Sequence, residues 1–215
     1  MKTAIQKGLI AEDGKMPFDM MGGYVLAIAF DLVPESRKKS MAGHLIRKIE
    51  ENGGCLDTGF LATPYLLDAI CKTGRVDQAY QLLLQTKCPS WLYEVKQGAT
   101  TIWENYIAYK EDGTPVMTSL NHYAFGCVDD WMFRKISGIQ PAAPGFKEIV
   151  IAPELNDAFT NAKARLYERI RENCNCMGSQ RWQVPYRSGY PLQHYGSGKP
   201  ARRKFVQDRK WSLYV

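Results

Sequence analysis

The stretch PESRKKSMAGHLIRKIEENGG, residues 34–54, decides the fold class, because it reads as one amphipathic helix with a clear beginning and end. Its apolar residues recur at the spacing of a single helix face: Met41, Leu45, Ile46 and Ile49. Charged residues, from Arg47 to Glu51, occupy the other face, and Asn52-Gly53-Gly54 supplies a C-cap. Such a helix needs neighbours that cover its apolar stripe.

Similar segments lie on both sides of this helix and are separated by short turns that contain glycine. We predict helices over residues 24–32, 64–72 and 76–85, and a long last helix from His122 to Ile136 that Ser137-Gly138 ends. Helix, short turn and helix thus form the repeated unit, which favours antiparallel helical hairpins and a mainly α fold.

Two further regions depart from the helical pattern. Residues 88–121 are rich in aromatic residues and only weakly periodic, as functional loops on a helical scaffold often are. Residues 146–151 alternate like a β-strand and end at Pro153, so we expect the helical domain to end near residue 142 and a β domain to begin there.

The net charge of +6 comes from one end of the chain. Residues 156–215 hold 12 Lys and Arg against 4 Asp and Glu, whereas residues 1–155 hold 16 against 18. A basic tail such as this, with Arg202-Arg203-Lys204, raises the question of a nucleic-acid arm, but no nucleic-acid-binding fold is recognisable around it. We therefore expect no nucleic-acid partner. No run of eighteen apolar residues and no secretory leader is present, so we expect no membrane association.

The six cysteines are scattered, and Cys174 and Cys176, with one residue between them, are too close for the usual zinc or redox spacing. We expect unpaired thiols rather than a disulfide framework, with no metal site and no cofactor.

Glu104 is the residue in the aromatic loop that suits chemistry best. It follows Trp103 directly, and aromatic rings stack on sugar faces while a nearby carboxylate serves as general acid or base. Taken alone, the signal is weak, because most such glutamates are solvated or structural. His122 likewise reads first as a helix-start or core histidine.

Six ordered blocks over about 120 residues closely resemble the C-terminal half of the bacterial α-L-rhamnosidase catalytic domain. They are Gly22–Ala27, Thr58–Leu67, Tyr80–Leu84, Pro89–Tyr93, Gln97–Glu104 and Ser119–Gly126. The resemblance implies a partial α/α toroid, with about three of the six helical hairpins of that family, followed by the start of a small β-sandwich and then an irregular basic tail.

The resemblance also implies roles for particular residues. Glu104 matches the general base that activates water in an inverting hydrolysis, and His122 matches a residue that contacts rhamnose. Trp91 and Phe60 are expected to line the pocket of a rhamnose-containing glycoside. The sequence departs from the family at Met20-Met21, where Thr-Gln is common, and at Asp129, where Gly is common.

Inversion requires a second carboxyl group as general acid. In the resembling family this acid lies upstream of the matched region, so no position here is assigned to it. Asp19, Asp57 and Asp112 qualify by chemistry only. We expect the chain alone to cleave no measurable glycoside, and we expect its uncovered apolar faces to favour self-association.

The resemblance stops after residues 159–164, where the charge balance changes. Reading a back-translation from Arg165 one nucleotide later permits short motifs of the sandwich type, so we hypothesise that residues 165–215 are frame-shifted. The predicted organisation is residues 1–142 as half-toroid, 143–164 as the start of the sandwich and 165–215 as the tail.

Two other functions stay open from the sequence. One is a different sugar enzyme built on an α/α toroid. The other is a non-catalytic helical-hairpin binding scaffold, since Gly74–Tyr80 resembles one turn of a helical repeat. No period near 34 residues recurs, which speaks against the scaffold.

Overall fold

The computed structural model describes residues 1–110, 112–146, 148–159, 161–170, 178–187 and 203–206. The chain divides into two compact units, Met1–Val128 and Asp129–Val215, and each is described by itself. The division falls earlier than the predicted end of the helical domain near residue 142, and the three-part organisation stays a prediction.

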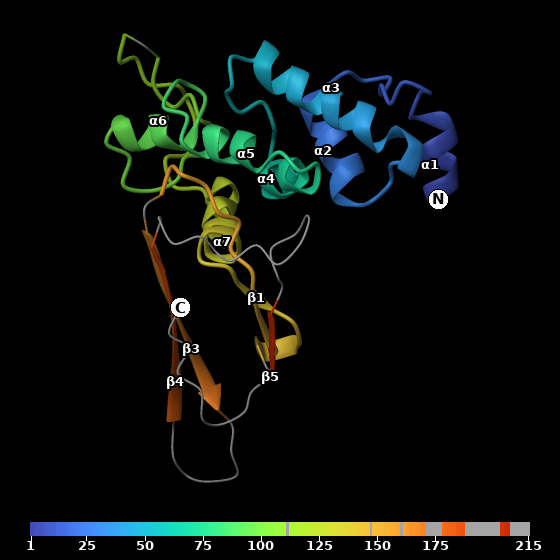
Figure 1. Ribbon diagram of the computed structural model, residues 1–215. Helices are drawn as coiled ribbons and strands as arrows, with labels where there is room; N and C mark the ends of the chain where they lie inside the picture. Colours follow the sequence, from blue (N-terminus) through green and yellow to red (C-terminus); the bar gives the residue numbers. More distant parts are fainter. Residues whose placement is uncertain (111, 147, 160, 171–177, 188–202, 207–215) are drawn as a thin grey trace. The chain divides into compact units, whose positions relative to one another are not determined.

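The first unit is helical, as expected (Figure 1). Its α-helices are α1 (Lys2–Gly8), α2 (Met21–Ala29), α3 (Lys38–Glu51), α4 (Thr63–Lys72), α5 (Val76–Leu83) and α6 (Trp91–Lys96). Two 3-10 turns, Glu35–Arg37 and Ala124–Cys127, complete it. Four of the helices lie where the sequence predicts them, within a few residues; α1 and α6 are short and lack the long periodic stripe that would have revealed them.

The core of this unit forms around α2, which packs against both α3 and α4. Tyr24 and Val25 of α2 are fully buried, because a helix covered on two sides needs apolar residues around most of its circumference. The predicted stripe of α3 faces this core, with Met41 and Leu45 fully buried, which confirms the amphipathic reading of residues 34–54. The turn at Gly74 then reverses the chain, so that α4 and α5 form a hairpin.

Polar contacts tie the segment before α2 to α3. The Tyr24 hydroxyl donates to Asp19 at 2.6 Å, and Asp19 also pairs with Arg47 at 3.3 Å and Lys48 at 3.1 Å. The charged face of α3 therefore has a structural partner in the segment that precedes α2.

The predicted long helix from His122 to Ile136 is wrong in its start and in its regularity. A 3-10 turn at Ala124–Cys127, helix α7 (Val128–Trp131) and a π-turn at Met132–Ile136 replace it. Helical geometry begins only after His122, whose N–H donates to the carbonyl of Ile102 at 2.8 Å and so ties this position to a distant segment.

The second unit holds two small antiparallel sheets. In one, β1 (Ile139–Pro141) pairs with β2 (Glu148–Ile151), and β2 pairs with β5 (Arg203–Val206). In the other, β3 (Asn161–Ile170) and β4 (Gly178–Arg187) form a ladder in which Asn161 faces Arg187. The strand predicted at residues 146–151 is confirmed over its last four residues, Glu148–Ile151.

The tail was expected to be irregular, but its described residues form β-strands. Residues 165–170, 178–187 and 203–206 are in strands. The sequence carries a signal for β4, since Trp182, Val184 and Tyr186 alternate with polar or proline positions, and period-2 alternation favours a strand. The frame-shift hypothesis stays untested, and Cys174, Cys176 and Arg202 lie outside the described residues.

Within the described part of the chain, no helix combines the length and the apolar content that crossing a bilayer requires.

A glycine pair tests how tightly the N-terminal segment is held on α3. Gly14 and Gly74 both have φ of +81°, but a Cβ on Gly14 would lie 2.6 Å from Ser40 Oγ and 2.9 Å from the Met41 backbone nitrogen, whereas a Cβ on Gly74 meets nothing within 4 Å. We expect Gly74→Ala to cost about 1 kcal/mol from backbone strain alone. Gly14→Ala should cost about 2–4 kcal/mol, because it adds a clash. Urea unfolding followed by circular dichroism measures the free energy of unfolding of each variant. Equal destabilisation by the two substitutions would show that the segment around Gly14 is not packed tightly against α3.

Candidate active site

The site is built where two loop segments run antiparallel to each other. The Glu104 N–H donates to the Ser119 carbonyl at 2.9 Å, and the His122 N–H donates to the Ile102 carbonyl at 2.8 Å. These two bonds place residues 102–104 beside residues 119–122. Glu104 and His122 are eighteen positions apart in sequence, and the pairing places them on neighbouring loop segments.

The carboxylate of Glu104 is held by the opposite segment. Its Oε2 accepts the Ser119 N–H at 2.9 Å and the Thr118 hydroxyl at 3.4 Å. The residue is half-buried, so one edge of the carboxylate is directed by the protein while the side chain retains access to solvent. An oriented, partly accessible carboxylate is suited to accept a proton from a bound water.

His122 is held by ring stacking and by a hydrogen bond to one ring nitrogen. Its ring stacks on Phe60, with centroids 4.7 Å apart and an angle of 12° between the planes, and on Tyr123, at 5.3 Å and 10°. Nδ1 accepts the Ala124 N–H at 3.3 Å, so the neutral ring carries its proton on Nε2. Nε2 is therefore the ring nitrogen left for a ligand, as a hydrogen-bond donor.

The structure places Phe60 and Trp91 differently. Phe60 is 41% exposed and lies directly on His122. Trp91 is 5% exposed, and its indole N–H donates to the Phe125 carbonyl at 2.9 Å. The rings of Tyr106 and Phe125 lie between Phe60 and Trp91. Trp91 therefore supports Phe60 indirectly, through these two rings. A pocket-lining role for either residue stays a prediction.

Glu94 on α6 is a buried carboxyl group that the sequence reasoning missed. It is 1% exposed, its Oε2 accepts the Trp103 N–H at 3.2 Å, and its buried Oε1 has no hydrogen-bond partner. Burial raises the pKa of Glu94 to about 7, partly offset by the Trp103 N–H. The sequence signal that could have revealed Glu94 is its position three residues after Trp91, because this spacing puts both side chains on the same, buried face of a short helix.

The three aspartates that qualified as a general acid by chemistry do not cluster with Glu104 in any contact that the structure shows. The hydroxyl of Tyr24, with Lys48 and Arg47, lowers the pKa of Asp19 to about 2, which is the wrong direction for a proton donor. The Thr114 side chain and N–H lower the pKa of Asp112, and Asp57 is exposed.

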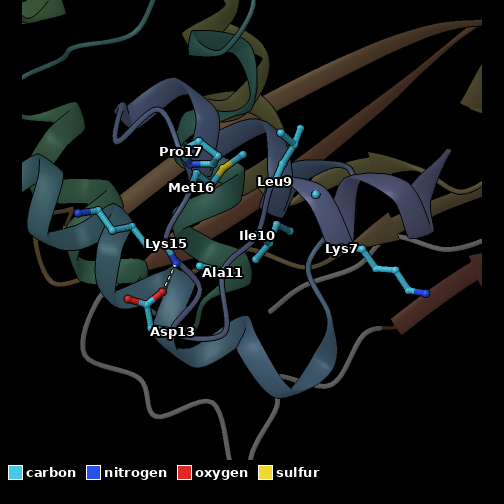
Figure 2. A pocket seen from close by; sticks show the side chains of 9 residues that line it. Lys7, Leu9, Ile10, Ala11, Asp13, Lys15, Met16 and Pro17 are labelled. Atoms are coloured by element: carbon cyan, nitrogen blue, oxygen red, sulfur yellow. Dashed lines mark hydrogen bonds between the residues drawn. The ribbon is translucent and has the colours of Figure 1, made fainter.

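A hollow of about 390 Å³ lies elsewhere, in the N-terminal segment (Figure 2). Residues of the stretch 7–17 line it, and none of the four residues predicted for the site is among them. Across the described residues, no group of three or more His, Cys, Asp or Glu side chains is arranged to hold a metal ion.

Comparison with known proteins agrees with this helical-hairpin architecture and its loop. A sequence model described as the bacterial α-L-rhamnosidase six-hairpin glycosidase domain matches residues 1–136. The fold and the matched region thus define part of a six-hairpin glycosidase domain. The chain belongs to the bacterial α-L-rhamnosidase six-hairpin glycosidase family.

Individual relatives support the same assignment. The chain is similar to an α-L-rhamnosidase of Streptomyces avermitilis (41% identity over 76% of this chain and 16% of the relative) and to one of Formosa agariphila (46% over 66% and 16%). Among solved structures, it is similar to the S. avermitilis α-L-rhamnosidase complexed with L-rhamnose, with a TM-score of 0.74 and 37% identity over 79% of this chain and 18% of that one.

A fungal enzyme gives a more distant match. The native α-L-rhamnosidase of Aspergillus terreus has a TM-score of 0.65 and 26% identity over 86% of this chain and 26% of its own. The chain spans about a sixth of the length of the two curated relatives from S. avermitilis and F. agariphila, and its residues 1–136 form part of a six-hairpin glycosidase domain.

The raised pKa of Glu94 predicts a pH-dependent stability. The unfolded side chain ionises near 4.5 and the folded one near 7, so the folded state binds more protons between these values and loses stability as pH rises from about 4.5 to about 7. Glu94→Gln removes this loss, and the variant should gain on the order of 3 kcal/mol relative to the wild type between pH 4.5 and pH 8. Glu50→Gln, an exposed change on α3, is the control. Parallel stability curves for wild type and Glu94→Gln would show that Glu94 ionises normally.

Proposed function

We propose that this chain supplies the general base and a sugar-contacting histidine of an enzyme that removes terminal α-L-rhamnose by inverting hydrolysis. The observation that carries the proposal is the backbone pairing of residues 102–104 with residues 119–122, which sets Glu104 and His122 on neighbouring segments. Family membership, and the L-rhamnose complex of the S. avermitilis relative, support rhamnose as the sugar.

In this mechanism Glu104 removes a proton from the water that attacks the anomeric carbon. The Ser119 N–H and the Thr118 hydroxyl hold one carboxylate oxygen, which limits the side chain to the orientations that leave the other oxygen for the water. The attacking water adds to one face of the sugar while the bond to the aglycone breaks on the other. The configuration at the anomeric carbon is thereby inverted.

His122 acts as a hydrogen-bond donor to a rhamnose hydroxyl. Its Nδ1 accepts the Ala124 N–H and its ring stacks on Phe60, which leaves the Nε2–H for the sugar. Phe60 contributes by holding this ring, and its exposed part also offers an apolar surface to the substrate.

The proton that the leaving oxygen needs comes, in this proposal, from a carboxylic acid outside these 215 residues. Asp19 is ion-paired with a lowered pKa, and Glu94 is buried against the Trp103 N–H, so neither is placed to protonate an aglycone. Family membership favours this function over another toroid sugar enzyme or a binding scaffold.

Self-association is a further part of the proposal. Several large apolar side chains of the first unit are well exposed: Phe18, Met20, Phe30, Leu61 and Tyr123. In a larger domain such side chains are natural contacts for other hairpins, and in a separate chain they favour association with a second copy.

The proposed roles are tested on the chain alone and on a chimera. The purified chain should release no nitrophenol from 4-nitrophenyl α-L-rhamnoside. Residues 1–136 should support hydrolysis when they replace the matched segment of the S. avermitilis enzyme. In that chimera Glu104→Gln should lower kcat by about 10²–10⁴-fold, the range for loss of a general base.

Glu50→Gln, on the exposed face of α3, is the matched control and should leave kcat unchanged. A folded chimera in which Glu104→Gln keeps more than a tenth of the activity would exclude Glu104 as the base. Rhamnose release by the chain alone, abolished by Glu104→Gln, would show that a general acid lies within these residues.

A further inference from the structure

Glu94 lies on the short helix α6, which is fixed at its beginning. The buried Ser90 side chain accepts the Tyr93 N–H at 3.1 Å and caps α6. Trp91 and Glu94 are both buried, so the face of α6 that carries them is part of the core. The position of the Glu94 carboxyl is thus set by the helix start and by packing rather than by solvent.

Two contacts connect Glu94 with the loop that leads to Glu104. Its backbone carbonyl accepts the Ala99 N–H at 3.1 Å, and its side chain accepts the Trp103 N–H at 3.2 Å. One residue therefore holds both the beginning and the end of the stretch 99–103. Trp103 is itself 3% exposed, so its N–H has no access to water and depends on this acceptor.

The protonation state follows from the surroundings. An ionised carboxylate needs several donors, but Glu94 receives one N–H and its Oε1 is buried without a partner. The titratable group that faces it is Tyr106, whose phenol pKa is itself raised by burial. Because neither the Trp103 N–H nor Tyr106 carries a positive charge, the neutral acid predominates below about pH 7.

We propose that Glu94 is a positioning residue for Glu104: its buried carboxyl anchors the Trp103 amide and so fixes the direction in which the next side chain leaves the segment. The inference rests on the proposed role of Glu104 as the base. A core residue thus affects the site through one hydrogen bond from the Trp103 N–H to its side chain, without any contact with substrate.

The test follows the Ser119 amide by ¹⁵N NMR in the full chain. This N–H donates to Glu104 Oε2, so its chemical shift changes as Glu104 titrates and reports where that carboxylate lies. Glu94→Gln keeps an acceptor oxygen and should preserve the Ser119 titration and the slow hydrogen exchange of Trp103. Glu94→Leu removes the acceptor, and we expect at least tenfold faster Trp103 exchange and a Ser119 titration reduced by half or more.

Two further variants keep the test decisive. Glu94→Asp retains the carboxyl but shortens the reach by one methylene, and it should give an intermediate loss if Glu94→Leu does not fold. Glu50→Leu, on exposed α3 surface, should change neither signal. A folded Glu94→Leu or Glu94→Asp chain with the wild-type Ser119 titration would overturn the proposal, because a merely structural residue would lower stability without moving Glu104.

The chimera separates this inference from the proposed function. Glu94→Leu should lower kcat by about tenfold or more with little change in KM, and Glu94→Gln should restore it. Full activity in Glu104→Gln would end the catalytic role of Glu104, while the NMR result for Glu94 would still stand by itself. Normal kcat in a folded Glu94→Leu chimera would end the positioning role alone.

Discussion

The pairing of residues 102–104 with residues 119–122 is the constraint on which the rest of the site depends. Two backbone hydrogen bonds of 2.8 and 2.9 Å join loops that have no regular secondary structure, and no packing of helices alone would set their register. A slip of one residue would turn Glu104 to the opposite side of its segment, since side chains of extended chain alternate in direction. The site therefore depends on register more than on composition.

Aromatic rings and helix α6 pack against the two paired segments and maintain their register. The aromatic rings of Tyr106 and Phe125 stack at 4.1 Å, and Phe125 also meets Phe60, so the segment before Tyr106 and the segment that ends at Phe125 share one core. Trp91 bonds the Phe125 carbonyl and Glu94 bonds the Trp103 N–H. Helix α6, only six residues long, thus contacts both loops and acts as their common support.

Two carboxyl groups of the first unit, those of Asp19 and Glu94, lie in different electrostatic surroundings. Asp19 keeps its charge because Tyr24, Lys48 and Arg47 surround it, and this ionised cluster links the N-terminal segment to α3. Glu94 lies in the core with a single N–H donor and favours its proton. Burial raises the pKa of Glu94, whereas the hydroxyl of Tyr24 and the two cations lower the pKa of Asp19, so the surroundings of each carboxyl decide which one is acidic.

The sequence by itself determined the helical hairpins, the buried stripe of α3, the family and the two residues on which the site is proposed. Periodicity and local motifs carry that information, because each depends on residues a few positions apart. Only the tertiary structure decided that the last helix starts after His122, that Trp91 lies beneath the rings, and that Glu94 is buried. Each of these depends on a contact between segments distant in the chain, and one-dimensional spacing carries no record of which distant backbone group a residue will meet.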